Sequence, residues 1–170
     1  MTDILILAIL ALGGFALWKR HSNKSGSEPG ETGGKEDVKL EYIRDRNVQI
    51  TEHFNSREFL CHCSRPDDFR ISTKLVMYLE ALREFLKLQP GSGFGIVIGS
   101  GYRCPAHNKE KNGATNSYHM SGMAADISVP GIAIVDVHKL CLVYWRLNGG
   151  IGFYSWGCHL DVGPVRIWKG

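Results

Sequence analysis

The chain has 170 residues, of which 44% are hydrophobic and 22% are charged, and its formal net charge at pH 7 is +3. This length fits one domain with a buried core, and the composition excludes a wholly disordered, collagen-like or low-complexity protein. The small net charge, spread over mixed signs, gives no indication of nucleic-acid binding.

An unbroken apolar run lies near the N-terminus, at residues 4–18, and Lys19 and Arg20 follow it directly. As a helix it would span about 22 Å, short of the roughly 30 Å hydrocarbon layer unless snorkelling side chains extend it. The run lacks the basic start and small-residue cleavage site of a cleavable signal peptide. We therefore expect an uncleaved membrane anchor in residues 1–20.

A polar segment follows the anchor. Residues 21–36 contain no aliphatic side chain and no Phe, Tyr or Trp, and they are rich in Gly, Ser and Glu. Such a segment cannot bury enough surface to fold, so a flexible linker is predicted. Residues 37–170 are globular in composition and contain no internal repeat, which indicates a single folded domain.

The first predicted helix of this domain is capped by Ser72 and ends before Pro90. Its apolar positions repeat every three or four residues, as on the buried face of a helix. They are Leu75, Val76, Leu79, Leu82, Phe85 and Leu86. A short β-branched run between glycines, Phe94–Ile98, predicts a buried strand that leads into Ser100–Arg103.

Further elements follow towards the C-terminus. Ala124–Val129 is predicted to be a strand and Ile134–Leu147 a helix, and the segment after it has short strands between glycines and prolines. Helices and strands in this order indicate an α+β fold, with the helices packed on one face of a small antiparallel sheet.

Histidine and carboxylate residues concentrate in two of these segments. His119 and Asp126 would lie about 10.5 Å apart along one continuous helix, too far to share a metal ion, so a turn at Gly122 is expected between them. Strand alternation sends His159 and Asp161 to the same face. Two histidines and one aspartate would leave an open position on zinc, as a hydrolytic site requires.

A pattern around these residues resembles the signature of the D-Ala-D-Ala carboxypeptidase family of zinc peptidases. Ser-x-His-x-x-Gly-x-Ala-x-Asp is matched by Ser117, His119, Gly122, Ala124 and Asp126. Upstream, residues 100–108 (SGYRCPAHN) resemble the family's Ser-Gly-(Tyr/Phe)-Arg-x-Pro-x-x-Asn segment. Downstream, residues 150–154 and 159–163 resemble its two closing strands, so that the likeness covers about residues 54–168.

The resemblance implies a hedgehog-like α+β fold and a zinc-dependent carboxypeptidase or endopeptidase acting on peptidoglycan stem peptides or cross-links. It implies that His119, Asp126 and His159 bind Zn²⁺ and that Arg103 holds the carboxylate or carbonyl of the substrate. For Ser117 two roles stay open: placing the substrate or capping its own turn.

One position departs from the family. Several branches carry Glu or Asp as general base three residues before the last histidine, where this chain has Trp156. Asp161 is the available carboxylate and is a candidate for the catalytic base. It could equally orient a metal ligand, and the sequence leaves both roles open.

The chain has 5 cysteines. Cys61, His62 and Cys63 are metal-ligand residue types, but no matching cysteine pair follows in the sequence, so a structural role is favoured over a second zinc site. Cys158, next to His159, is expected to point away from the metal if it lies in a strand.

We therefore predict a zinc metallopeptidase that binds peptidoglycan peptides and, through residues 4–18, a lipid membrane. The alternative is a catalytically weak, zinc-containing wall-binding or virion structural module.

Because peptidoglycan lies outside the cytoplasmic membrane, we expect the catalytic domain on the cell-wall side or in a virion membrane. Its role would be in wall remodelling or in phage lysis or entry. Lys19, Arg20 and Lys24 oppose this placement, since the positive-inside rule would retain the C-terminal side in the cytoplasm.

Overall fold

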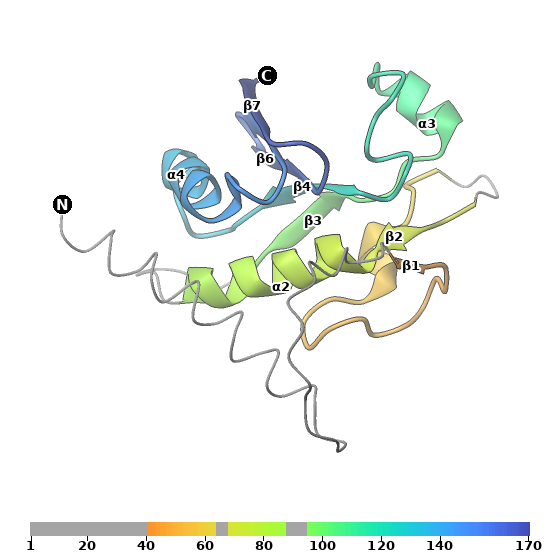
Figure 1. Ribbon diagram of the computed structural model, residues 1–170, viewed down its shortest axis with the longest axis horizontal. Coiled ribbons are helices and arrows are strands. Elements are labelled where there is room, and N and C mark those ends of the chain that lie inside the picture. Colours follow the sequence, from red (N-terminus) through yellow and green to blue (C-terminus); the bar gives the residue numbers. More distant parts are fainter. Residues whose placement is uncertain (1–40, 64–67, 88–94) are drawn as a thin grey trace, which may run out of the picture. The chain divides into compact units, whose positions relative to one another are not determined.

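The computed structural model describes residues 41–63, 68–87 and 95–170, which belong to one compact unit (Figure 1). The predicted anchor, residues 4–18, and the predicted linker, residues 21–36, lie outside the described residues. Among the described residues, no helix has the length and apolar character needed to cross a membrane.

The centre of the fold is a five-stranded sheet with the strand order β3-β4-β6-β5-β7. Its strands are β3 (Val97–Ser100), β4 (Ala124–Ser128), β5 (Gly150–Tyr154), β6 (Gly157–Asp161) and β7 (Arg166–Lys169). A second, two-stranded antiparallel sheet joins β1 (Tyr42–Ile43) to β2 (Ile71–Ser72). The predicted α+β class is confirmed.

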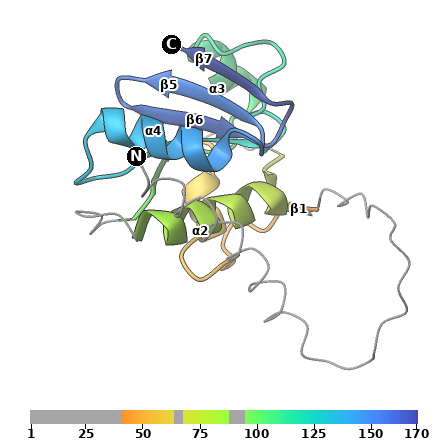
Figure 2. The same ribbon diagram turned by 60° about the vertical axis from the view of Figure 1, so that its left-hand side comes forward.

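The described residues also form four helical segments: η1 (Ser56–Phe59), α2 (Thr73–Lys87), α3 (Pro105–Glu110) and α4 (Ile134–Trp145). Figure 2 shows α4 lying against the strands of the large sheet, and contacts join it to β5, β6 and α2. The two long helices and the sheet therefore enclose the core.

The prediction for α2 is confirmed in detail. The Ser72 hydroxyl accepts a hydrogen bond from the Leu75 backbone N–H at 3.5 Å, as a helix cap does. The six apolar residues at helical spacing, from Leu75 to Leu86, are all buried. The helix ends at Lys87, before Pro90.

Three expectations about elements need correction. The strand predicted as buried at Phe94–Ile98 is observed as β3 at Val97–Ser100, and Val97 is 46% exposed because β3 forms an edge of the sheet. The sheet is mixed, since β7 crosses to the far side of β5 and pairs with it in parallel. The last helix ends at Trp145, whose carbonyl accepts a hydrogen bond from the Asn148 N–H as the chain turns towards β5.

Strand register places one row of residues across the open face of the sheet. Ser100 of β3 pairs with Asp126 of β4, which pairs with His159 of β6. His159 pairs in turn with Gly152 of β5, which pairs with Trp168 of β7. Neighbouring residues such as Ile127, Leu160 and Ile151 are buried on the other face of the sheet. Asp126 and His159 thus stand side by side at the centre of the sheet.

Candidate metal centre

Three side chains that the sequence singled out meet on this row. His119 Nε2 lies 3.1 Å from His159 Nδ1 and 3.2 Å from Asp126 Oδ1. His159 Nδ1 lies 2.9 Å from the same Asp126 oxygen. His119 is 2% exposed and Asp126 is 9% exposed, so the three atoms form a largely buried cluster.

A turn brings His119 to the two strand residues. The His119 carbonyl accepts a hydrogen bond from the Gly122 N–H, and Gly122 has a φ of +69°. A Cβ at Gly122 would lie 2.2 Å from the Arg70 carbonyl oxygen, so glycine suits both the space and the backbone conformation. The predicted turn between His119 and Asp126 is confirmed.

The hydrogen bonds of the outer ring nitrogens determine whether the inner nitrogens of His119 and His159 carry a proton or a lone pair. His119 Nδ1 lies 2.7 Å from the Gly101 carbonyl, which can only accept, so His119 donates from Nδ1 and its Nε2 carries a lone pair. His159 Nε2 lies 3.2 Å from Asp161 Oδ2, so that His159 donates from Nε2 and its Nδ1 carries a lone pair. Two imidazole lone pairs and one carboxylate oxygen therefore face one another.

Such an arrangement fits a zinc ion. Three acceptor atoms in mutual contact repel one another unless a cation lies among them. Nitrogen and oxygen ligands at about 2.0–2.1 Å from a tetrahedral zinc ion are about 3.3 Å apart. The three separations here are 2.9, 3.1 and 3.2 Å. His119, Asp126 and His159 could therefore hold zinc and leave a fourth position towards the pocket.

The electrostatic surroundings act differently on the three groups. Burial alone would raise the pKa of the Asp126 carboxyl, but its contacts with His119 and His159 hold it well below its usual range, which keeps it ionised. Burial lowers the pKa of His119, which favours the neutral imidazole that binds a cation. Burial would also lower the pKa of His159, but its contacts with Asp126 and Asp161 raise it, so that a cation at the cluster must displace a proton from this ring.

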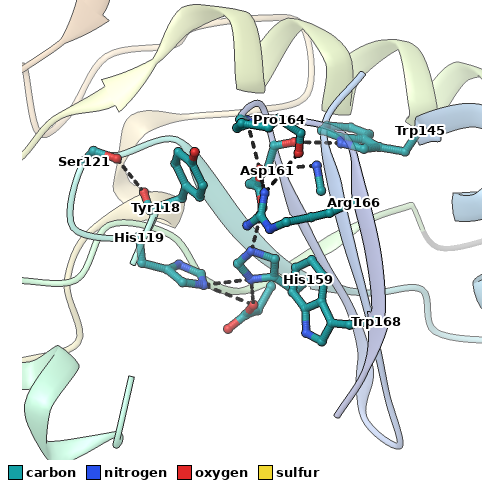
Figure 3. A network of polar contacts seen from close by, with 12 residues as sticks. Tyr118, His119, Ser121, Trp145, His159, Asp161, Pro164, Arg166 and Trp168 are labelled. Carbon is teal, nitrogen blue, oxygen red and sulfur yellow. Dashed lines mark hydrogen bonds and ion pairs between the residues drawn. The ribbon is translucent and has the colours of Figure 1, made fainter. Parts of the chain in front are cut away.

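Asp161 lies behind His159, away from the cluster. Its carboxylate is fully buried and accepts hydrogen bonds from both terminal nitrogens of Arg166, at 2.7 and 3.1 Å. The Gly163 N–H donates to it at 2.9 Å and the Gly150 N–H at 3.2 Å. Figure 3 shows Asp161 and Arg166 beside the His159 ring. Of the two roles left open, this geometry favours orienting His159.

Arg103 lies on the other side of Asp126. Its Nη2 forms an ion pair with Asp126 Oδ2, and its Nε donates to the Ser100 hydroxyl at 2.8 Å. The guanidinium has five N–H groups, so donors remain for a substrate, and Arg103 lines the pocket.

Ser117 also lines the pocket. Its turn is closed by its backbone carbonyl, which accepts a hydrogen bond from the Met120 N–H at 3.0 Å. The turn is therefore held by backbone hydrogen bonds.

A pocket of about 1060 Å³ opens over the cluster. One wall comes from α3 and the residues after it, including His107, Lys111 and Asn116. The wall across the sheet comes from β5, β7 and the turn before β6, and contains Tyr154, Trp156 and Trp168. Trp156 stacks on Tyr154 with ring centroids 4.7 Å apart, so the position that carries a carboxylate in several related branches is an aromatic surface here.

Sequence reasoning missed Arg166 and its aromatic neighbours. The Arg166 guanidinium lies 4.9 Å from the ring centroids of both Tyr118 and Trp168, between the two rings (Figure 3). The available signal was strand alternation, which places Arg166 and Trp168 on one face of the last strand. Nothing local in the sequence pairs Arg166 with Asp161.

Comparison with known proteins shows the family of the chain. Residues 31–168 match the family described as "Peptidoglycan L,D-endopeptidase MepK". A "Probable peptidoglycan L,D-endopeptidase MepK" of Haemophilus influenzae is 35% identical over 98 residues, covering 52% of this chain and 52% of the relative. The "Peptidoglycan L,D-endopeptidase MepK" of Escherichia coli K12 is 38% identical over 80 residues, covering 43% of each.

The chain thus spans about half the length of the curated relatives it matches. The family match, however, covers most of the chain and includes every residue of the candidate metal centre. It also confirms the resemblance to the D-Ala-D-Ala carboxypeptidase class of zinc peptidases. We conclude that the chain belongs to the peptidoglycan L,D-endopeptidase MepK family of zinc peptidases.

Proposed function

We propose that this chain is a zinc-dependent endopeptidase that cuts an L,D peptide bond in peptidoglycan, the activity for which its relatives are named. The observation that carries the proposal is the cluster of three lone-pair donors, 2.9 to 3.2 Å apart, on the floor of an open pocket. The family membership supplies the substrate class.

His119, Asp126 and His159 would hold the zinc ion, which supplies Lewis acidity towards a peptide carbonyl and activates water for attack. The other residues of the chain hold the two histidine rings in the orientation needed to bind the ion. The Gly101 carbonyl fixes the His119 ring, and the Asp161 carboxylate fixes the His159 ring. Partners of this kind set the tautomer and ring orientation of metal-binding histidines.

Arg103 is proposed to bind the substrate beside the cluster. Its ion pair with Asp126 and its hydrogen bond to Ser100 fix the guanidinium at the pocket wall. A fixed fork of N–H donors suits a carbonyl oxygen that gains negative charge in the transition state. Ser117, on the same wall, is proposed to help place the substrate backbone.

The lining of the pocket suits an endopeptidase. It includes residues of α3 and of the loop after it as well as residues of β5 and β7, so the pocket continues on both sides of the metal ligands. Such a pocket suits a peptide that runs past the metal centre. Arg103, Lys111 and Arg166 line the pocket, and among the described lining residues Asp126 is the one carboxylate, which suits stem peptides with free carboxylates.

A second candidate is a zinc-containing module that binds the cell wall without cutting it. Trp156 favours it, because this position carries the general base in several related branches. The geometry of Asp161 adds to this, since its oxygens are taken up by Arg166, Gly163, Gly150 and His159. The two candidates differ in whether the substrate is converted.

We also propose that residues 4–18 anchor the chain in a membrane and that residues 21–36 tether a peptidase domain on the cell-wall side or in a virion membrane. The apolar composition of the first segment and the polar composition of the second support this. The family match begins at residue 31, within the second half of this proposed linker.

Mass spectrometry of muropeptides tests the proposed function. The full chain, supplied with zinc, is incubated with purified peptidoglycan, and the soluble products are weighed. The endopeptidase produces fragments whose masses place the cut at an L,D bond, and His119→Ala produces none. Release of a single terminal residue would instead indicate a carboxypeptidase. Binding to peptidoglycan without any product would identify the wall-binding module and refute the proposal.

A further inference from the structure

A second cluster of metal-ligand residues lies outside the catalytic ligand set. Cys61 Sγ is 3.3 Å from Cys63 Sγ, and Cys63 Sγ is 3.3 Å from Cys104 Sγ. The three sulfurs all lie within 4.8 Å of one another. His107 adds a nitrogen, since its Nδ1 lies 3.2 Å from Cys61 Sγ.

The cluster joins two parts of the chain that are about forty residues apart. Cys61 and Cys63 follow η1, whereas Cys104 is the N-cap residue of α3 and His107 lies in its first turn. The sequence alone showed no partner for the Cys61–Cys63 pair, because the spacing Cys104-x-x-His107 becomes a matching pair only when the fold brings it alongside. Cys61, Cys104 and His107 are all buried.

The contacts favour a cation over a disulfide. The sulfur separations of 3.3 Å, from Cys63 to Cys61 and to Cys104, are well beyond the bonded distance of about 2.05 Å. Two thiolates on one tetrahedral zinc ion would be about 3.8 Å apart, a few tenths of an ångström more than observed. Each of the three sulfurs also contacts another member of the cluster. Buried polar atoms need partners that satisfy them, and a shared ion would satisfy all of these atoms at once.

Backbone donors point at the sulfurs as well. The Cys104 N–H donates to Cys61 Sγ at 3.3 Å, and the His107 N–H donates to Cys104 Sγ at 3.4 Å. Such hydrogen bonds stabilise negative charge on sulfur, the form that binds a metal. They are thus the outer contacts that a metal site needs.

We propose that Cys61, Cys63, Cys104 and His107 bind a second zinc ion with a structural role. A closed set of three cysteines and one histidine is a ligand set of structural zinc sites. The site would fasten the segment after η1 to the start of α3. Arg103 directly precedes Cys104, and the Tyr102 N–H donates to the Phe59 carbonyl at 2.8 Å, so the same connection holds the substrate-binding arginine in place.

Counting zinc in the purified full chain tests the proposal without using activity. We expect two zinc ions per wild-type chain by elemental analysis, and one in Cys61→Ser and Cys104→Ser. Cys141→Ser is the matched control, because Cys141 is also a buried cysteine but lies in α4, and it should keep two. His119→Ala should lose the other ion and keep the one bound by sulfur.

Cobalt substitution of the wild-type chain provides a readout that does not depend on variants folding. Cobalt bound by thiolates gives an intense near-ultraviolet charge-transfer absorption that a site of two histidines and one aspartate cannot give. We expect this absorption in the wild type, in His119→Ala and in Cys141→Ser. Its absence from the wild type, or one zinc per chain with a disulfide among the three cysteines, would overturn the proposal.

His107 is tested separately. We expect His107→Ala to bind the sulfur-held zinc at least tenfold more weakly in a chelator competition, as is usual when a ligand is lost. An unchanged affinity would overturn the assignment of His107 as the fourth ligand.

Discussion

The two histidines of the candidate metal centre are held by different kinds of partner. His119 donates to the backbone carbonyl of Gly101, which no side-chain replacement can remove. His159 depends on the side chain of Asp161, which is in turn held by Arg166. The carbonyl of Asp161 also accepts a hydrogen bond from the Trp145 indole at 2.9 Å, so α4 fixes this end of β6. The partner of His159 can therefore be removed by a side-chain substitution, whereas His119 can be disturbed only by a shift of the backbone at Gly101.

Asp161→Asn tests whether Asp161 orients His159. We expect zinc affinity to fall by about 10- to 100-fold, as is typical when a partner of a metal ligand is changed. A chelator competition measures this, with Asp136→Asn, at an exposed position of α4, as the control. Full zinc affinity combined with lost turnover would instead identify Asp161 as the general base.

Arg103→Ala tests substrate binding beside the metal centre. Because Arg103 pairs with Asp126 Oδ2 while Oδ1 faces the histidines, we expect the zinc content to remain. Loss of a charge-assisted contact should remove about 2–4 kcal/mol of transition-state stabilisation and lower kcat/KM accordingly. Arg146→Ala, at the exposed end of α4, serves as the control. An unchanged kcat/KM would remove Arg103 from the substrate site.

Among the elements, the end of β3 controls the geometry around His119. Gly101 follows β3 directly and packs against η1, and a Cβ there would lie 2.5 Å from Phe59 Cα. It would also lie 2.7 Å from the Phe59 carbonyl oxygen, and because Phe59 Cα and this oxygen are backbone atoms, neither can move aside cheaply. The carbonyl that orients His119 thus belongs to a residue with no room for a side chain.

Gly101→Ala should therefore lower the free energy of unfolding by about 1–3 kcal/mol, the usual cost of overpacking, and weaken zinc binding as the carbonyl shifts. Gly99→Ala is the matched control within β3, because a Cβ there would meet only the Asp126 carbonyl at an ordinary 3.5 Å. Thermal unfolding and zinc titration measure both variants. Equal behaviour of the two alanine variants would contradict the packing argument.

The elements also show where sequence reasoning succeeds and where it ends. The helix from Thr73 was predictable because its buried residues recur at helical spacing, and the strand from Ala124 was predictable as a short run between Gly122 and Gly131. The exposure of β3 and the parallel pairing of β7 were not, since both depend on which distant strand lies alongside.

The same division applies to the candidate site. The three candidate ligands could be named from motifs resembling a known family. Their meeting depends on the β4–β6 register that pairs Asp126 with His159. The Asp161–Arg166 pair likewise arises from tertiary packing, which no local pattern reveals.

At the scale of the whole molecule, the proposed tether limits where the peptidase works. Sixteen residues, 21–36, have a root-mean-square reach of about 20–25 Å as a flexible chain. A domain held this way would act on peptidoglycan close to a membrane surface. The positive charges after residues 4–18 favour the opposite orientation, so the placement needs a direct test.

Protease treatment of intact spheroplasts provides that test. If the domain lies on the cell-wall side, added protease cleaves the linker at residues 21–36 while the spheroplasts are intact. A cytoplasmic marker protein should survive in the same sample. Cleavage that occurs only after lysis would show that the wall-side placement is wrong.

Zinc binding by His119, Asp126 and His159 can be observed by anomalous diffraction. Data from crystals of the zinc-loaded full chain are collected on both sides of the zinc absorption edge. We expect a zinc peak bounded by His119 Nε2, His159 Nδ1 and the Asp126 carboxylate. A chain that cuts peptidoglycan but shows no zinc peak among these three side chains would contradict this assignment.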